Sequence, residues 1–199
     1  SLANDNSTIT ISISESVFNT DGGSGSLTES SFNLEISNGT ADVSSTPSSI
    51  SVSGNIYTLG LDFGDTIPDG SETLTVNPAS STSIYDLSGN AMAISQSNNS
   101  VTLNDNTVPT IISSSIPYNN SSIIITFNET VYSTTGQTGS LTVDDFTLDI
   151  TGGSATITSV PTSISQSGTE YTLGLSLDGN PTGEELLTVS PALNSIYDA

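Results

Sequence analysis

The sequence repeats itself, and this internal repeat constrains the fold more than any other feature. Residues 1–63 align with residues 115–177 without a gap, and about half of the aligned positions are identical. Two single-residue deletions then bring SIYD at 83–86 onto SIYD at 195–198. A match of this length at one fixed period indicates a repeated structural unit of about 112–114 residues.

Two domains are therefore expected, at 1–105 and 106–199. The junction between them reads VTLNDNTVPTI, in which one strand ends near Leu103 and the next begins near Thr110. The linker is only about five residues long, and Pro109 restricts the backbone at its end. We expect the two domains to sit end to end with limited freedom.

Apolar and polar residues alternate along short segments, which is typical of strands with one buried face. The first repeat shows this pattern at 9–13, 32–36, 57–63, 73–78 and 100–105. Clusters of Gly, Asn, Asp, Ser and Pro separate the segments, and no segment has a helical period. About seven short strands per repeat predict an all-β chain of two tandem immunoglobulin-like Greek-key β-sandwiches.

The core is expected to be aliphatic, because only 6% of the residues are aromatic and Cys and Trp are absent. Four aromatic residues at alternating positions are expected to anchor it: Phe32, Tyr57, Phe146 and Tyr171. We also expect one strand face of each repeat to point inward, carrying Leu59, Leu61 and Phe63 in the first and Leu173, Leu175 and Leu177 in the second.

The charge excludes several functions. The chain has 21 Asp and Glu residues and no Lys, Arg or His, which gives a formal net charge of −21. Nothing can neutralise the phosphates of a nucleic acid, and no apolar run approaches the ~20 residues of a membrane helix. Without His a Ser-His-Asp triad is excluded. The carboxylate pairs at 144–145 and 184–185 are interpreted as charged loops, so no enzymatic activity is expected.

Five segments together resemble a known group of proteins. They are ITFNETVYS, SLTVDDFTL, YTLGL, SIYDLSGNA and VTLND. The chain is similar to the tandem bacterial Ig-like repeats of giant secreted surface and adhesin proteins, including the swimming-motility-associated type. The positions that match the motifs of this family are Glu15, Glu129, Asp86, Gly89 and Asn90. The resemblance covers both repeats and implies tandem, extracellular use at the cell surface. The total lack of Lys and Arg departs from the family pattern.

Calcium is the one cofactor to consider for the acidic loops, because Ca²⁺ takes six to eight oxygen ligands from carboxylates, amides and backbone. The candidate ligands are Asn104, Asp105 and Asn106 in the linker, joined by Glu15 or Asp86 if the fold brings them close. The alternative interpretation is that these Asp and Asn residues only form turns. The sequence leaves both open.

Asn-x-Ser/Thr sequons are candidate glycosylation sites. They occur at Asn6, Asn38, Asn98, Asn119, Asn120 and Asn128. In a chain this rich in Asn, Ser and Thr, about six sequons arise by chance, so the sequons alone do not indicate glycosylation.

Each repeat is expected to lack one edge strand. Residue 1 aligns with residue 115, so the first repeat has no copy of TVPTIISS; residue 199 aligns with Leu87, so the second has no copy of SVTLND. Unpaired strand edges invite pairing with another strand. The expected partners are further copies of the repeat, in the same chain or in neighbouring subunits.

Two functions follow from these observations. The first is a structural extender segment of an extracellular surface filament, stalk or giant adhesin, in which repeats provide length and the negative charge provides hydration. The alternative is a calcium-dependent adhesive or glycan-binding module of a surface adhesin. The few aromatic residues fall at core positions rather than in an exposed patch, which favours the structural function.

Overall fold

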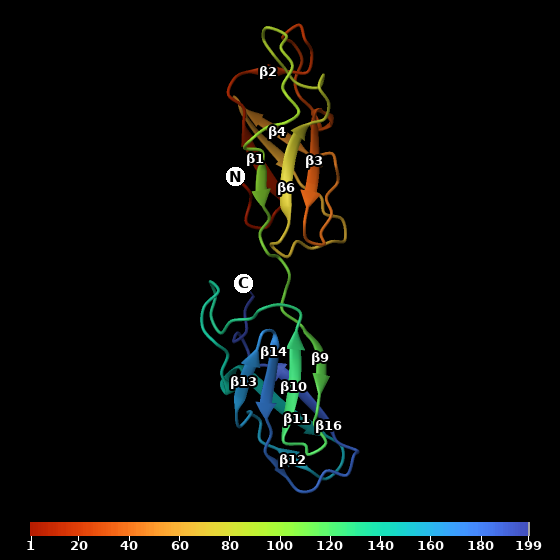
Figure 1. Cartoon of the computed structure of the whole chain (residues 1–199), viewed down its shortest axis with the longest axis vertical. Coiled ribbons are helices and arrows are strands. Elements are labelled where there is room, and N and C mark those ends of the chain that lie inside the picture. Colours follow the sequence, from red (N-terminus) through yellow and green to blue (C-terminus); the bar gives the residue numbers. More distant parts are fainter. Residues whose placement is uncertain (199) are drawn as a thin grey trace. The chain divides into compact units, whose positions relative to one another are not determined.

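The computed structural model describes residues 1–198, and in this part of the chain every element longer than one turn is a β-strand (Figure 1). All of the strand pairs are antiparallel. Two short 3-10 turns, η1 (Glu29–Ser31) and η2 (Val143–Asp145), each lead into a strand. The prediction of an all-β chain is confirmed.

The chain divides into two compact units, which are described separately. Unit 1 covers Ser1–Thr107, and unit 2 begins at Val108. Residues 104–106, expected in a linker, therefore belong to unit 1. The expected end of the second domain, residue 199, lies outside the described residues.

Unit 1 contains two three-stranded sheets and one small pair of strands. Its strands are β1 (Thr8–Ser12), β2 (Val17–Phe18), β3 (Phe32–Ser37), β4 (Ile50–Ser53), β5 (Ile56–Gly60), β6 (Thr73–Pro78), β7 (Tyr85–Asp86) and β8 (Ser100–Thr102). One sheet has the order β1-β5-β4 and the other the order β3-β6-β8, while β2 pairs with β7. All five segments predicted as strands from their alternation contain a strand.

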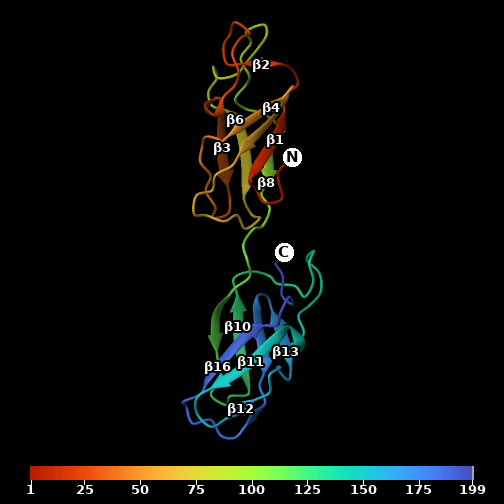
Figure 2. The same ribbon diagram turned by 180° about the vertical axis from the view of Figure 1, so that it is seen from behind.

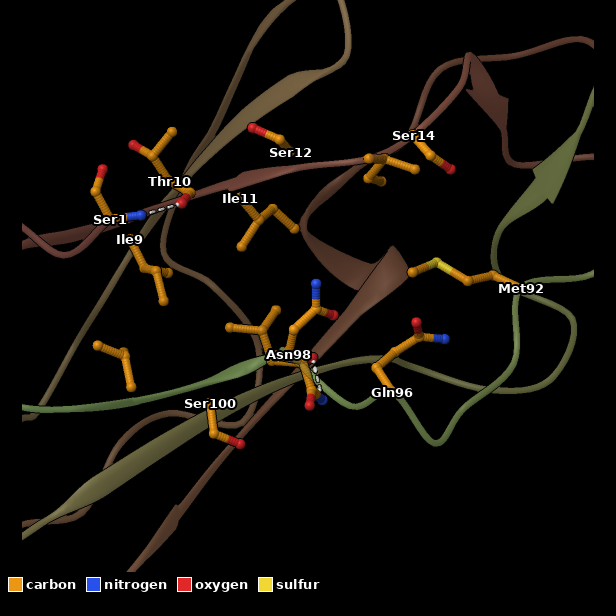
Figure 3. A pocket seen from close by; sticks show the side chains of 14 residues that line it. Ser1, Ile9, Thr10, Ile11, Ser12, Ser14, Met92, Gln96, Asn98 and Ser100 are labelled. Carbon is orange, nitrogen blue, oxygen red and sulfur yellow. Dashed lines mark hydrogen bonds between the residues drawn. The ribbon is translucent and has the colours of Figure 1, made fainter.

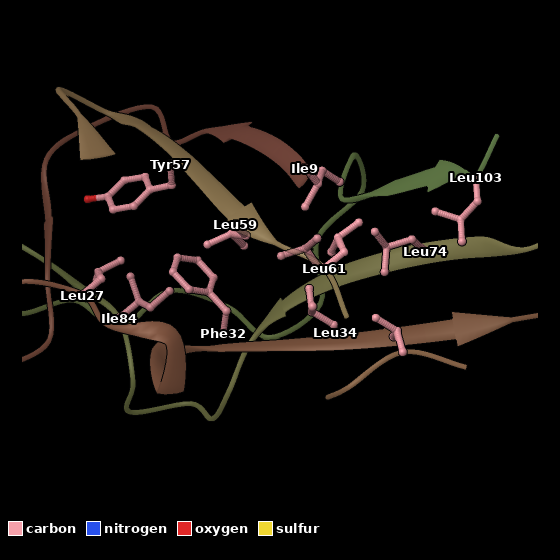
Figure 4. Close-up of a cluster of buried hydrophobic side chains, with 12 residues drawn as sticks. Ile9, Leu27, Phe32, Leu34, Tyr57, Leu59, Leu61, Leu74, Ile84 and Leu103 are labelled. Atoms are coloured by element: carbon pink, nitrogen blue, oxygen red, sulfur yellow. The ribbon is translucent and has the colours of Figure 1, made fainter. Parts of the chain in front are cut away.

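The two larger sheets of unit 1 share one hydrophobic core, which gives a sandwich-like arrangement (Figure 4). Leu59 of β5 lies in the same cluster as Leu34 of β3 and Leu74 of β6, and Leu59 and Leu74 have no exposed surface. The rings of Phe32 and Tyr57 lie 6.0 Å apart between the sheets. Both rings are buried, as the sequence predicts.

Unit 2 is built from a second set of strands (Figure 2). They are β9 (Ile111–Ser115), β10 (Ser122–Phe127), β11 (Phe146–Thr151), β12 (Thr156–Ile157), β13 (Ile164–Ser167), β14 (Glu170–Gly174), β15 (Leu177–Asp178) and β16 (Leu186–Pro191). The largest sheet has the order β13-β14-β10-β9, and the pairs β11-β16 and β12-β15 complete the unit.

Three aromatic rings form the centre of the unit 2 core. Phe127 lies 5.7 Å from Tyr171 in an edge-to-face arrangement and 6.5 Å from Phe146. All three side chains are buried, and both predicted anchors of this repeat, Phe146 and Tyr171, are among them. Offset and edge-to-face ring pairs of this kind stabilise a core beyond the area that they bury.

The sequence repeat is also a repeat of strand register. Ile9 pairs with Leu59 in unit 1, and their counterparts in unit 2 pair in the same way, Ile123 with Leu173. The β3–β6 and β11–β16 pairs also share one register, since Phe32 faces Pro78 and Phe146 faces Pro191. Register fixes which face of a strand is buried, so the two units place equivalent side chains in equivalent cores.

The two units differ in how completely those side chains are covered. Leu59 and Leu61 in unit 1 and Leu173 in unit 2 are buried as predicted, whereas Phe63, Leu175 and Leu177 are only partly buried. The burial of β6 alternates between partly buried and buried residues, but β16 has no fully buried residue. In unit 1, β8 pairs with β6, and no strand of the described chain pairs with the corresponding side of β16.

Candidate functional site

The predicted calcium ligands at 104–106 form part of an asparagine network with Asn6. The Asn6 amide nitrogen donates to the carbonyl oxygen of Asn104 at 2.8 Å and to Oδ1 of Asn106 at 2.6 Å. In return, the backbone N–H and the side-chain amide of Asn104 donate to Oδ1 of Asn6 at 3.0 and 3.1 Å. Asn6 is 1% exposed, so this network anchors the segment after β8 to the loop before β1.

Asp105 and Asn106 are also bound within unit 1. Oδ1 of Asp105 accepts the backbone N–H of Thr107 at 2.9 Å, and the Asp105 backbone forms an antiparallel bridge with Asp69. The N–H of Asn106 donates to the carbonyl of Pro68 at 2.9 Å. Residues 104–106 therefore extend the pairing of β8 along the loop that precedes β6.

The other two calcium candidates lie at the opposite end of β1. Asn6 precedes β1, whereas Glu15 follows it in an exposed turn, and Asp86 pairs with Val17 beyond that turn. Asp86 accepts hydrogen bonds from its own turn, and those from the side chain and backbone of Asn90 hold its pKa below the ordinary value. The structure does not bring the five predicted ligands together. Among residues 1–198 no three acidic side chains cluster in a way that could hold a metal ion.

The sequon asparagines fall into different environments. Asn6 is buried, and its side-chain nitrogen is occupied by two hydrogen bonds, so it presents no free amide to a sugar in the folded chain. Five others are exposed, namely Asn38, Asn98, Asn119, Asn120 and Asn128. Glycosylation of these five stays a prediction.

A buried carboxylate, Glu72, holds together two loops of unit 1. Its side chain has no exposed surface. Oε1 accepts the backbone N–H groups of Thr40 and Ala41 at 3.1 and 3.0 Å, and Oε2 accepts that of Asp69 at 3.1 Å. Because the chain has no basic side chain, backbone dipoles alone balance this charge. Gly39 has a φ of +61° and leaves room for the carboxylate, since a Cβ atom there would collide with the Glu72 side chain.

Glu185 is the counterpart of Glu72 in unit 2, and it makes the same kind of contacts. Its Oε1 accepts the N–H groups of Ser154 and Ala155 at 2.9 and 3.2 Å, and Oε2 accepts that of Thr182 at 2.9 Å. Desolvation on its own would raise the pKa of Glu185, but these backbone donors lower it to about 2. Unlike Glu72, Glu185 is partly exposed.

The paired carboxylates at 144–145 and 184–185 do not face each other as an acid and a base. Asp145 accepts the backbone N–H of Thr142 at 2.6 Å and thereby caps η2. Glu185 points into its backbone clamp, while the neighbouring Glu184 is exposed. In each pair, one carboxylate, Asp145 or Glu185, therefore binds the backbone of its own unit.

Unit 1 contains a hollow of about 570 Å³ beside β1, here named the β1 hollow (Figure 3). Ile11 of β1, Met92, Gln96 and residues 98–101 contribute to its lining. At one end of this strand edge, Ser1 and Thr10 exchange both backbone hydrogen bonds, each at 2.7 Å. In unit 2 the strand that corresponds to β1 is β10, and the equivalent edge is covered by β9.

Unit 2 contains a hollow of about 540 Å³ beside β16, here named the β16 groove. Its lining comes from β11, β15 and β16, from the loops next to β16 and from the segment before β10, and includes Ile116, Tyr118, Asn120, Leu175, Glu185 and Leu187. The Tyr118 side chain is fully exposed. In unit 1 the equivalent side of β6 is covered by β8.

The chain matches no family model, no curated protein and no solved structure. The repeat type that its motifs resemble therefore stays a prediction. No helix within residues 1–198 has the length and apolar character needed to cross a membrane.

Proposed function

We propose that this chain is a structural extender segment made of two immunoglobulin-like repeats, and that it forms part of an extracellular surface filament, stalk or giant adhesin. The observation that carries the proposal is a complementarity between the units. The strand position left open in unit 1 is filled in unit 2 by β9, and the position left open in unit 2 is filled in unit 1 by β8.

This complementarity is expected of an array of repeated modules in which the strands between two modules complete the sheets of either neighbour. In a repeat array each module buries its apolar edge against neighbouring elements, and stability comes from the modules together with their interfaces. The segment 100–115 holds β8 and β9, and each of these strands completes a different unit. Further copies of the same repeat are therefore the proposed partners, in the same chain or in neighbouring subunits.

The charge and the turn chemistry support a role at the surface rather than in catalysis. The net charge of −21 has no basic side chain to oppose it, which favours a hydrated and well-separated fibre. The acidic side chains with assigned contacts, such as Glu72, Asp86 and Glu185, bind backbone or turn groups of their own unit. Their contacts are structural, and the proposal needs no ligand.

Immunogold electron microscopy tests the proposal. Antibodies raised against residues 1–199 are applied to intact, unpermeabilised cells of the source organism. The proposal predicts label along fibres or stalks at the cell surface, at repeated positions. Label confined to the cell interior would contradict it. A glycan array probed with the chain, with and without calcium, distinguishes the adhesive alternative, which requires calcium-dependent binding to a sugar.

A further inference from the structure

We propose that the β16 groove binds an extended strand with the chemistry of residues 99–106, in which alternating apolar side chains precede Asn-Asp-Asn. The bound strand adds to the open edge of β16, and its first Asn bonds to Asn120. The strand comes from a further repeat. This origin rests on the proposed function, but the binding itself does not. Binding by the groove follows from the geometry of the two units.

Unit 1 shows how such a strand is held. β8 lies antiparallel to β6, with Leu74 opposite Val101. The N–H of Val76 donates to the carbonyl of Asn99 at 2.9 Å, and the N–H of Leu103 donates to the carbonyl of Glu72 at 3.0 Å. These bonds continue the ladder beyond both ends of β8, so residues 99–103 act as one docked segment.

The backbone of β16 is positioned to accept the same ladder. β16 pairs with β11 in the register that β6 has with β3. Val189 corresponds to Val76, whose N–H faces β8, so the N–H of Val189 faces the open side of β16. Leu186 at the start of β16 is 66% exposed. Addition of a strand to an edge of this kind is a recurrent mode of peptide recognition.

The apolar lining of the groove corresponds to the residues that pack with the β8 segment in unit 1. Three positions are shared: Ile116, Leu175 and Leu187 in unit 2 correspond to Leu2, Leu61 and Leu74 in unit 1. In unit 1 these positions lie in one cluster with Val101 and Leu103. Within the described part of unit 2 nothing replaces those two side chains, and Ile116 is 45% exposed. Two apolar side chains of an incoming strand, spaced two apart, fit this lining.

Asn120 has the same backbone conformation as Asn6. Both have a left-handed backbone, with φ of 53° and 55°. The N–H of Asn120 donates to the carbonyl of Pro117 at 2.9 Å, as that of Asn6 donates to Ala3 at 3.0 Å. The next residue in each loop, Ser121 in unit 2, donates to the side-chain oxygen two residues earlier. The two side chains differ only in cover, because Asn6 is buried under residues 104–106 and Asn120 is exposed at the groove.

The Asn-Asp-Asn sequence is the part of the strand that makes binding selective. In unit 1, Asn6 donates to the carbonyl of Asn104 and to the side chain of Asn106, and it accepts two bonds from Asn104. An amide side chain supplies both donors and acceptors, so only a partner with donors and acceptors at the matching places satisfies it. The bond from the Asn104 side chain to Oδ1 of Asn6 and the bond from Asn6 to Oδ1 of Asn106 depend on the two Asn side chains, whereas the other two use the backbone of residue 104. A strand that has the apolar alternation but lacks both Asn side chains therefore gives Asn120 only the two backbone bonds.

The test is an NMR titration of the isotopically labelled 199-residue chain with a synthetic peptide of residues 98–107. We expect one peptide per chain, with shifts at Ile116–Asn120, Leu175 and 185–189, slowed exchange of the Val189 amide, and no change in unit 1. Asn120→Gly in the chain removes the counterparts of all four hydrogen bonds that Asn6 makes with residues 104 and 106. Asn104→Ala in the peptide removes the counterparts of the two bonds that the Asn104 side-chain nitrogen donates, and each substitution should weaken binding at least about tenfold. Glycine tolerates the positive φ of Asn120, so the loop keeps its shape.

Asn128→Ala is the matched control, because this exposed asparagine of unit 2 lies outside the groove; it should leave peptide affinity unchanged. The proposal is overturned if the peptide does not bind at millimolar concentration, if the shifts fall on unit 1, or if both Asn substitutions leave affinity unchanged. It is also overturned if, without peptide, two copies of the chain pair through β16 and the added peptide does not displace the second copy. None of these results depends on where the protein is found in the cell, so failure here is distinct from failure of the proposed function.

Discussion

Asn6 and Asn104 hold each other by reciprocal hydrogen bonds, with Nδ2 of Asn6 2.8 Å from the carbonyl oxygen of Asn104 and the backbone nitrogen of Asn104 3.0 Å from Oδ1 of Asn6. This pair joins the loop before the first strand of unit 1 to the segment after its last strand. The counterpart of Asn6 in unit 2, Asn120, has the same backbone conformation but is exposed. Substitutions at Asn6 and Asn120 can therefore be compared to measure how much the hydrogen-bond network stabilises unit 1, apart from the contribution of the loop conformation.

Asn6→Gly should destabilise unit 1 by about 2–4 kcal/mol, because four hydrogen bonds of a buried side chain are lost at about 1 kcal/mol each. Asn120→Gly should change the stability of unit 2 by less than about 0.5 kcal/mol, as is usual for a surface position. Glycine accepts the positive φ at both positions, so backbone strain does not contribute. Chemical unfolding followed by amide signals from each unit measures the two effects. Equal losses in the two variants would contradict the role given to the network.

Glu72→Gln should destabilise unit 1 by at least about 2 kcal/mol. The NH₂ group of Gln is a hydrogen-bond donor, so in this fully buried position it would face a backbone N–H that needs an acceptor. Glu185→Gln should cost unit 2 less, since water reaches its partly exposed clamp. Glu184→Gln serves as the control, because this neighbouring side chain is exposed. Thermal unfolding of the three variants ranks them. If Glu72→Gln is as stable as the parent chain, the buried clamp does not hold the two loops.

The contribution of Glu185 to the stability of unit 2 should be lost as the pH falls from about 4.5 towards 2. The folded pKa of Glu185 is about 2, below the ordinary value of 4.5. A depressed folded pKa contributes stability that is fully present above the unfolded pKa and is lost as the pH falls through the folded one. Glu185→Gln removes this term, while the relief of repulsion among the other carboxylates stays the same. The difference between parent and variant should therefore shrink towards pH 2. A Glu185 carboxyl that titrates near 4.5 by NMR would contradict the account.

Salt should raise the melting temperature of the chain. Like charges about 4 Å apart repel by about 1 kcal/mol even in water, and dissolved ions screen that repulsion. Because the five predicted calcium ligands lie at opposite ends of unit 1, Ca²⁺ and Mg²⁺ should raise the melting temperature equally at matched ionic strength. Melting curves in chelator, Ca²⁺ and Mg²⁺ measure this. A larger effect of Ca²⁺ that disappears in Asp105→Asn would instead place a calcium site at 104–106.

The strands were predictable because the alternation of apolar residues is direct evidence of a buried face. Phe32, Tyr57, Phe146 and Tyr171 are all buried, as their positions in the pattern indicate. The internal repeat indicated in addition that equivalent strands of the two units pair in the same register. The partial exposure of Leu175 was not foreseen, because the pattern shows which face points inward but not whether another strand covers that face.

The polar contacts were harder to foresee. Asn6 and Glu72 stand in turn-rich segments, where Asn and Glu are usually solvated. Their burial depends on partners distant in sequence, and neither periodicity nor spacing records such partners. One signal was present for the glutamates, because both repeats place a Glu directly before the strand that becomes β6 or β16. Residues 104–106 lie together because they are consecutive, but the sequence could not show that Glu15 and Asp86 lie at the other end of β1.

The central claim is that a strand like β8 completes unit 2 as β8 completes unit 1. Its most direct test is to append a second copy of residues 88–107 after Ala199 and to measure hydrogen exchange and thermal unfolding of unit 2. The account predicts that the Val189 amide becomes as protected as that of Val76. It also predicts that unit 2 melts about 10 °C higher or more, because two further apolar side chains are buried and each kilocalorie shifts a domain of this size by about 4–8 °C. An appended copy that carries Asp at the positions of Val101 and Leu103 should give neither effect. Unchanged protection and melting with the intact copy would contradict the account.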